Sequence, residues 1–545
     1  MKIGLFSFIA HCGRHDLDVS MPFKWFWYLQ DLSLVVLSGV LLVLSFPNFN
    51  IGLFAWIAMV PLFLVLIGKS LRYGFMLSLI TGMVFSLGVF NWILEISDYT
   101  LLHHAILDLY LGLYVGVFGL LFCFIDRHKG TASALFVAPF IWVFLEYIRS
   151  NLFFLAFPWV LLAHSQYQVS SVIQVASLSG AYGISFLIVI VNSAIAFMVY
   201  ALFGWLKKDK LEGLGGTKFV VVSAAASLVF SLLYGYQKIS KPIVGREFKV
   251  SLVQGNIDQN KKWDRKYAKF IMETYSDLTQ EASEDEPALI VWPETATPRA
   301  INMDRKLSHE VKGIANSAGT YLLLGSSQPQ KFKVGDSKNI KYFNSAFLIS
   351  PEVGKTKNQR YDKIRLFPFG EYLPYKEVIP WSSINVPEVS GYVTGKEFTI
   401  FKHPDFQFGV TICWENIFPD FVRQFVKRGA QFIINITNEA WFGETAAPEQ
   451  FVSMSVFRAV ENRLFVIRCA NTGISCFIDP CGRIVNRLND KHGGEIFIRG
   501  TLTAPVILPL ESKTFYTRYG DWFAWLSILC SMLFLFIAFF KNTSS

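Results

Sequence analysis

The chain has 545 residues, of which 52% are hydrophobic, with a mean hydropathy of +0.39 and a formal net charge of +9. A soluble enzyme of this length is normally more polar, so the composition excludes an ordinary soluble protein. The positive charge does not indicate a nucleic-acid-binding protein, because most basic residues of the apolar part lie in the loops between apolar segments.

Apolar segments fill the chain from Trp25 to Tyr236 and return from Trp522 to Phe540. A membrane-spanning helix needs roughly 20 apolar residues, so we predict a polytopic α-helical membrane protein with about eight transmembrane helices. The first candidate is expected to be a retained anchor rather than a removable signal peptide, and the sixth is long enough to be broken or tilted. The candidate spans are 27–46, 52–68, 73–95, 104–125, 132–149, 173–203, 218–236 and 521–540.

Charged loop residues predict the orientation of these spans. Lysine and arginine gather in alternate loops, while the loop after 73–95 carries Glu95 and Asp98. Basic loops remain in the cytoplasm. We therefore expect both termini to be cytoplasmic and the residues between the last two spans to be external, which is the periplasmic side of a bacterial inner membrane. The basic loop residues are Lys69, Arg72, Arg127, Lys129, Lys207, Lys208, Lys210 and Lys218.

Three parts follow from this pattern: a membrane domain at 1–243, an inserted domain at 244–505, and a C-terminal transmembrane helix with a short cytoplasmic tail at 506–545. In the insert, short apolar runs alternate with segments of helical character, which is typical of an α/β domain. The predicted strands are 249–254, 289–292, 321–325, 346–349, 408–412, 432–436, 465–468 and 475–478, and the predicted helices are 264–282, 302–316, 417–428 and 448–462.

Glu294 directly follows the apolar run 288–292 and Pro293. A helix or turn cap is one interpretation, although Asp, Asn or Ser is preferred at caps. A desolvated glutamate with a raised pKa could instead act as a general base and then as an acid. We favour the catalytic interpretation.

Lys363 lies in the aromatic-rich stretch 361–372. Most lysines are simply solvated, but a charge among apolar side chains needs a partner. An ammonium held there could stabilise an oxyanion, and Glu371 could pair with it or orient the site.

Cys413 ends the apolar run 408–412 and is followed by Trp414, Glu415 and Asn416. A thiol at such a strand-to-helix elbow is expected to have a pKa lowered by the helix N-terminus. A carboxylate, an amine and a thiol are the minimum set for acyl transfer through a thioester. Cysteine is also a common core residue, and the local pattern leaves both interpretations open.

The chain shows no zinc or phosphate-binding signature, and His103 and His104 have no carboxylate cluster near them in sequence. We therefore expect neither a metal site nor a cofactor. Glu146 and Arg149 lie three residues apart in a candidate span. They are either functional, as charged intramembrane residues often are, or a structural pair.

Together, the patches around Glu294, Lys363 and Cys413 resemble the nitrilase, or carbon–nitrogen hydrolase, superfamily and its Glu-Lys-Cys triad. With the membrane spans, the chain resembles the apolipoprotein N-acyltransferase family over nearly its whole length, and this resemblance implies an αββα sandwich for the inserted domain. The residues that carry it are 252–257, 262–264, 361–363, 367–374, 413–415, 437–443 and 458–463. Trp414 and Glu439 depart from the family's usual Tyr and Asp, which puts substrate fit in doubt more than the reaction.

The resemblance implies a role for each matching residue. Glu294 would be the general base, Lys363 the oxyanion stabiliser and Cys413 the nucleophile. Glu371 and Glu415 would support the site, and Trp263, Trp414 and Trp441 would bind substrate.

The implied reaction has two steps. Cys413 takes an acyl chain from a membrane phospholipid, typically phosphatidylethanolamine, and the thioester then acylates the α-amino group of an S-diacylglyceryl cysteine on an apolipoprotein. The thioester must be protected from water, and the aromatic stretches 367–375 and 440–442 could form a lid or a membrane-facing arm, or could pack in an ordinary core.

Two other functions remain open on the sequence. A membrane-tethered amidase would use the same triad with water as the acceptor and would hydrolyse a soluble amide. A transporter or receptor with a periplasmic binding domain would be expected to show internal repeats or broken helices with polar groups at mid-membrane, and we find no convincing repeat.

Overall fold

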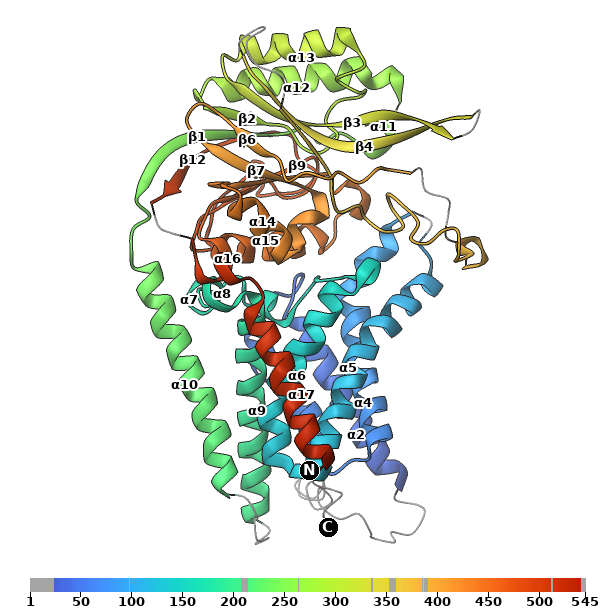
Figure 1. Ribbon diagram of the computed structural model, residues 1–545, viewed down its shortest axis with the longest axis vertical. Helices are drawn as coiled ribbons and strands as arrows, with labels where there is room; N and C mark the ends of the chain where they lie inside the picture. Colours follow the sequence, from blue (N-terminus) through green and yellow to red (C-terminus); the bar gives the residue numbers. More distant parts are fainter. Residues whose placement is uncertain are drawn as a thin grey trace. The chain divides into compact units, whose positions relative to one another are not determined.

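The computed structural model describes residues 24–97, 99–206, 214–262, 264–334, 337–351, 359–384, 386, 391–510 and 513–540. It divides into two compact units, coloured along the chain in Figure 1. The helical unit holds the described residues of Met1–Leu94, Tyr99–Ile239 and Asp521–Ser545. The sheet unit holds those of Glu95–Asp98 and Ser240–Gly520.

Seven helices in the described part of the chain are long and apolar enough to cross a membrane. They are α2 (Lys24–Leu44), α4 (Leu71–Phe90), α5 (Leu101–Lys129), α6 (Thr131–Asn151), α9 (Ala181–Leu206), α10 (Leu214–Ile239) and α17 (Trp522–Phe540). The predicted sixth span is indeed interrupted, because the short helices α7 (Ser170–Ile173) and α8 (Ala176–Ser179) precede α9. The chain is therefore a polytopic α-helical membrane protein.

The prediction of a full helical span at 52–68 is wrong. The segment forms a 3₁₀ helix, η3 (Gly52–Trp56), and a short helix, α3 (Val60–Leu66), separated by a turn. Asn192 of α9 fills the break, because its side chain accepts a hydrogen bond from the Met59 N–H and donates one to the Ala55 carbonyl, both at 2.9 Å. Irregular backbone is tolerated at membrane depth only when its polar groups are satisfied in this way.

The broken segment nevertheless runs back along α2. At its start, the N–H of Ile51 donates to the carbonyl of Leu44 at the end of α2. At its end, the Lys69 ammonium lies 2.6 Å from the Asp31 carboxylate in the first half of the same helix. Successive long segments therefore keep alternating directions through the helical unit.

Helices α4 and α5 approach closely because small residues line their interface. A methyl group on Gly82 would lie 2.8 Å from Gly112, and one on Gly119 would lie 2.0 Å from the Ser78 hydroxyl. Close backbone approach through small residues is the usual basis of helix association in lipid.

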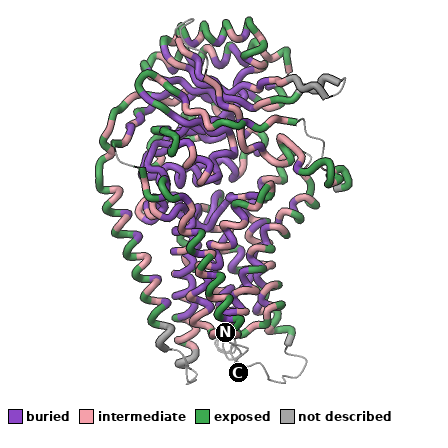
Figure 2. The backbone as a smooth tube through the Cα atoms, viewed as in Figure 1, coloured by how far each residue is buried: buried purple, intermediate pink, exposed green. Residues whose placement is uncertain are grey.

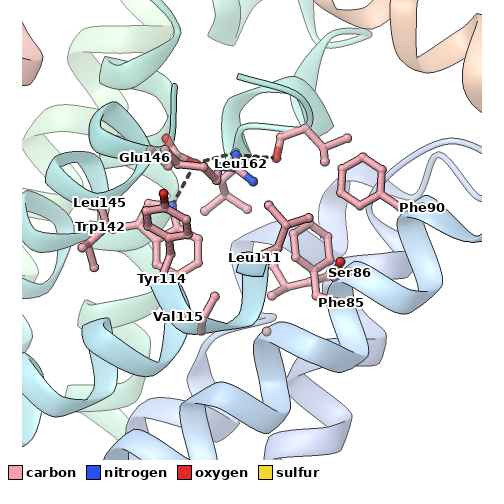
Figure 3. A pocket seen from close by; sticks show the side chains of 14 residues that line it. Phe85, Ser86, Phe90, Leu111, Tyr114, Val115, Trp142, Leu145, Glu146 and Leu162 are labelled. Carbon is pink, nitrogen blue, oxygen red and sulfur yellow. Dashed lines mark hydrogen bonds between the residues drawn. The ribbon is translucent and has the colours of Figure 1, made fainter. Parts of the chain in front are cut away.

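A cavity in the helical unit is lined by α2, α4, α5, α6 and the loop after α6, as Figure 3 shows. Glu146 and Arg149, the two charged residues of a predicted span, lie on the wall of this cavity, and both bind the loop. Glu146 accepts hydrogen bonds from Trp142 Nε1 (3.0 Å) and Leu162 N (2.8 Å), and Arg149 donates to the Trp159 carbonyl at 3.1 Å. This geometry supports a structural role for these two residues.

In the sheet unit, two six-stranded sheets have the orders β12-β1-β2-β3-β4-β5 and β11-β10-β9-β8-β7-β6. Parallel pairs form their centres, β1–β2–β3 in the first and β7–β8–β9 in the second. The first sheet contains β1 (Gly245–Gln254), β2 (Leu289–Val291), β3 (Tyr321–Val334), β4 (Ser337–Ile349), β5 (Gln359–Asp362) and β12 (Gly500–Pro509). The second contains β6 (Ile400–Lys402), β7 (Gln407–Ile412), β8 (Ile433–Thr437), β9 (Val466–Ala470), β10 (Cys476–Ile478) and β11 (Ile484–Arg487).

Each sheet is covered by helices on one face and packs on the other sheet with its second face. Helices α12 (Ala268–Ser283) and α13 (Arg305–Ser317) cover the first sheet. In the core that these helices form with the sheet, Trp292 stacks on Tyr275. Helices α14 (Pro419–Lys427) and α15 (Ala447–Asn462) pack on β7, β9 and β10 of the second. Strand β1 contacts β9 and β4 contacts β7, and most of the central strands are buried (Figure 2). The predicted αββα sandwich is confirmed.

All eight predicted strands and four predicted helices of the insert are present. The sequence prediction missed the strands at the sheet edges, β5, β6, β11 and β12, and underestimated the lengths of β3 and β4.

A fully buried ion pair between Arg468 of β9 and Glu439 holds the second sheet together at the ends of its strands. Arg468 also donates to the Asn435 side chain at 2.8 Å. We expect Arg468→Met to lower the free energy of unfolding by about 3–5 kcal/mol, because it leaves a buried carboxylate unpaired. The melting temperature should fall by roughly 10 °C. The melting temperature is measured with a thiol-reactive fluorophore, which labels the buried cysteines as they become exposed on heating.

The control is Arg246→Met, which removes a surface pair with Asp405 whose side chains are 60% and 46% exposed. Such a pair contributes at most about 1 kcal/mol, so this variant should melt with the wild type. If Arg468→Met melted at the same temperature as the wild type, a stabilising role for the buried pair would be contradicted.

Candidate active site

The three sequence-predicted catalytic residues follow strand ends. Glu294 follows β2, Lys363 follows β5 and Cys413 follows β7. The first two belong to one sheet and the third to the facing sheet, so the sandwich itself brings the carboxylate, the ammonium and the thiol together.

Lys363 lies between two carboxylates, and its side chain is only 2% exposed. Its ammonium is 2.9 Å from Glu371 Oε2 and 3.9 Å from Glu294 Oε1. Glu371 also accepts a hydrogen bond from the Phe367 N–H at 2.7 Å, which fixes the carboxylate that holds the lysine. A buried charge is tolerated when it is paired in this way.

The Glu294 side chain is held at both oxygens. Asn344 of β4 donates to Oε1 at 2.7 Å, and the Asn438 N–H donates to Oε2 at 2.8 Å. The Lys262 ammonium donates to the Glu294 main-chain carbonyl at 2.9 Å. The carboxylate therefore has a single well-defined position.

Burial and opposing charges set the protonation of these groups. Burial raises the pKa of Glu294, and Lys363 only partly offsets this effect, as expected for a general base. Burial lowers the pKa of Lys363, but Glu371, Cys413 and Glu294 together raise that pKa above its ordinary value, so this ammonium stays charged.

Cys413 occupies the predicted strand-to-helix elbow, in a strained conformation. Its φ of 55° lies in the left-handed region, which is costly for a residue with a side chain and is concentrated at functional sites. Asn435, which binds Arg468, donates to the Cys413 carbonyl at 3.0 Å and supports the turn.

The expectation of a lowered thiol pKa is wrong. Burial raises the pKa of Cys413, and the charges of Glu294 and Glu371 add to this effect against Lys363. Cys413 begins η9 (Cys413–Ile417), a 3₁₀ helix of only five residues with little dipole to oppose them. The resting thiol is therefore protonated and needs a base.

Glu415 joins the segment that carries Lys363 to the end of β7, directly before Cys413. Its fully buried carboxylate accepts hydrogen bonds from the N–H groups of Ile364, Arg365 and Ile412 and from the Tyr361 hydroxyl, at 2.7 to 2.9 Å. Burial raises its pKa to about 7. This arrangement fits the expected supporting role.

The tryptophans expected to bind substrate differ in their surroundings. Trp414 is buried, donates to the Arg365 carbonyl at 2.6 Å and packs edge-on against Phe367 and Phe418. Trp441, in the 3₁₀ helix η10 (Ala440–Phe442), is 50% exposed. Trp263 lies outside the described residues.

The sequence analysis predicted no functional role for three residues of the site: Lys262, Asn344 and Asn438. Asn344 is a polar residue in a strand that continues into the apolar run 346–349, and that contrast was the available signal. Lys262 and Asn438 lie within the family motifs but carry no local mark of burial. Among the described residues, no group of three or more His, Cys, Asp or Glu side chains is arranged to hold a metal ion.

A sandwich whose strand ends bring together glutamate, lysine and cysteine defines an enzyme of the carbon–nitrogen hydrolase class, and the family model described as "Carbon-nitrogen hydrolase" matches residues 249–506. The model described as "Apolipoprotein N-acyltransferase N-terminal domain" matches residues 38–194. The chain belongs to the apolipoprotein N-acyltransferase family, and it is an acyltransferase rather than an amidase or a transporter.

Curated relatives extend this similarity over almost the whole chain. The apolipoprotein N-acyltransferase of Geobacter metallireducens is 36% identical, over 94% of this chain and 96% of its own length. That of Chlorobaculum tepidum is 30% identical, over 90% of this chain and 92% of its own length. Among solved structures, an amidase of the nitrilase superfamily from Nesterenkonia AN1 matches 51% of this chain and 96% of its own at 19% identity, with a TM-score of 0.36.

The position of Glu294 depends on Gly325 of the neighbouring strand β3. A methyl group added there would lie 2.5 Å from the Thr295 nitrogen and 2.7 Å from the Glu294 Cα. We expect Gly325→Ala to displace the carboxylate and to slow acyl transfer about 100-fold, since small displacements of catalytic groups cost this much. Single-turnover acylation of Cys413 measures the effect.

Gly313→Ala on the exposed side of α13 is the matched control, because no atom lies within 4 Å of the added methyl group. It should keep full activity and add about 0.5–1 kcal/mol of stability. A fully active Gly325→Ala protein would show that Glu294 need not be held where it lies.

Proposed function

We propose that the chain transfers a fatty acyl group from a membrane phospholipid, through a thioester on Cys413, to the α-amino group of the S-diacylglyceryl cysteine of apolipoproteins. This is the last step of bacterial lipoprotein maturation. The observation that carries the proposal is the paired and buried Glu294–Lys363–Glu371 cluster beside the elbow cysteine, in a chain of this family.

In the first step, Glu294 accepts the Cys413 proton as the sulfur attacks the sn-1 ester carbonyl. The raised pKa values of both groups favour transfer during the attack over a preformed thiolate. The Lys363 ammonium stabilises the tetrahedral oxyanion. The ester C–O bond then breaks, and Glu294 returns the proton to the oxygen of the departing lysophospholipid.

In the second step, the α-amino group attacks the thioester. Glu294 accepts a proton from the nitrogen, Lys363 again stabilises the oxyanion, and the C–S bond breaks as the thiol regains a proton. The products are the N-acyl amide and the free enzyme. The catalytic groups therefore return to their starting states.

Both substrates are lipids, which explains why such chemistry would be tethered to membrane helices. Moving an acyl chain into water costs about 0.8 kcal/mol per CH₂, and a membrane-bound site avoids this. Exposed aromatic side chains near the site, Phe369 at 40% and Trp441 at 50% exposure, support the proposed lid over the thioester and contact with substrate. We also propose substrate contacts for Trp263 and Trp414.

We further propose that the chain lies in the bacterial inner membrane with residues 244–505 as its periplasmic catalytic domain and both termini in the cytoplasm. Two of the basic loops support this orientation. Lys69 and Arg127 lie at one end of the helical unit, where the Gly68 N–H donates to Asp126 at 2.7 Å. Of the remaining charged loop residues, Asp98, Lys207, Lys208 and Lys210 lie outside the described residues.

The direct test is intact-mass analysis after incubation with phosphatidylethanolamine vesicles. We expect the wild type to gain one acyl chain that hydroxylamine removes, with release of lysophospholipid, and Cys413→Ala to gain none. Addition of a diacylglyceryl peptide with a free α-amino group should discharge the adduct, and the same peptide with a blocked amine should not. Intact phospholipid and an unmodified wild-type enzyme would contradict the proposal.

The orientation has its own test, in a background in which Cys12, Cys413 and Cys530 are replaced by alanine, so that the remaining native thiols are the buried ones. A membrane-impermeant maleimide should label Lys491→Cys, in an exposed turn of the sheet unit, in cells with a permeabilised outer membrane. Arg127→Cys, at the exposed end of α5, should react only after the inner membrane is disrupted. The reverse pattern would overturn the proposed orientation.

A further inference from the structure

Lys262 is a buried lysine for which the mechanism above has no role. It ends the short helix α11 (Gln259–Lys262) and is 2% exposed. Its ammonium donates to the Glu294 main-chain carbonyl at 2.9 Å. Burying an ammonium is costly unless a partner compensates, so its position against the proposed general base requires an explanation.

The loop that carries Lys262 is tied to the same site. Asn471 binds the Ile257 main chain on both sides, accepting from its N–H at 3.0 Å and donating to its carbonyl at 2.7 Å. Asn438 donates from its side chain to Gln259 at 2.7 Å and from its main chain to Glu294 at 2.8 Å. Lys262 and Glu294 are therefore held in one hydrogen-bonded frame.

The distribution of charge in the site indicates a role for Lys262. Lys363 is closest to Glu371, at 2.9 Å, and is a full 3.9 Å from Glu294. Glu294 is thus the more distant of the two carboxylate partners of Lys363, and Lys262 is a second cation whose charge acts on it. The ionisable groups that interact with Glu294 come from several elements: Lys262, Lys363, Glu371, Tyr392, Cys413 and Glu439.

We propose that Lys262 is a positioning residue that fixes the main chain of Glu294 and keeps its carboxylate available as a proton acceptor. This inference depends on the proposed function, because it assigns Lys262 to the base of that reaction. Burial lowers the pKa of Lys262 to about 8, so the ammonium is charged at acidic and neutral pH. There its charge opposes the burial that raises the pKa of Glu294.

The test compares Lys262→Met, Lys262→Gln and Lys262→Arg with Lys261→Met in the full-length protein. Lys261 is the exposed neighbour on the same short helix, so its variant is the matched control. The readout is the rate of Cys413 acylation by phosphatidylethanolamine vesicles between pH 5 and 9. Melting temperatures establish that each variant is folded, and the glutamine variant serves if the methionine variant is not.

Loss of the cation raises the pKa of Glu294, so the acidic limb of the profile should move to higher pH by about one unit. At pH values below the limb, this shift equals a roughly tenfold slower acylation. The arginine variant should keep the limb near its wild-type position, and Lys261→Met should match the wild type. Uniform slowing of the uncharged variants with an unmoved limb would overturn the inference.

Failure of the proposed function would be recognised separately, because the wild type itself would then form no thioester. In that case, alkylation of Cys413 by iodoacetamide tests the charge effect without phospholipid. Removal of Lys262 should move the pH midpoint of alkylation upward, since the coupled thiol and carboxylate lose a stabilising cation. An unchanged midpoint would refute the role of Lys262.

Discussion

The active site depends on one buried arrangement of charges, the Lys363 ammonium between Glu371 and Glu294. Neither sign of charge is stable there alone, because each group is removed from water. The lysine keeps its proton because of the two glutamates, and Glu294 can ionise because of the lysine. The surrounding polar side chains, from Asn344 to Glu415, serve mainly to keep these groups at distances where that balance holds.

The sandwich provides these distances through its strand order. Strand β2 is central in its sheet and β5 is at the edge, while β7 lies next to the edge of the facing sheet. The Lys363 N–H still donates to the Asn344 carbonyl of β4 at 2.8 Å, but the segment that follows is irregular and no strand ladder fixes its course. Glu415 performs that task from the opposite sheet, since its carboxylate binds both the 364–365 main chain and the end of β7.

Central elements could be predicted from the sequence because they carry continuous apolar runs or clear helical periods. The edge strands could not, since β5, β6 and β11 are four residues long or shorter and are only partly buried. The candidate catalytic residues could be recognised because Glu294 and Cys413 follow apolar runs, Lys363 lies in an aromatic-rich stretch, and the family motifs surround all three. The raised pKa of Cys413 could not be foreseen, because it depends on burial and on two carboxylates from distant parts of the chain. The break in the segment 52–68 was hidden for the same reason, since its polar groups are satisfied by a side chain far along the sequence.

That side chain, Asn192, has a consequence for biogenesis. It lies 133 residues after Met59 and accepts a hydrogen bond from the Met59 N–H. It also lies 137 residues after Ala55 and donates a hydrogen bond to the Ala55 carbonyl. Until α9 has entered the bilayer, the broken segment holds main-chain groups that lipid cannot satisfy. The break in the segment 52–68 is therefore closed by a residue that is synthesised much later, and a chain truncated before Asn192 would leave the segment without this partner.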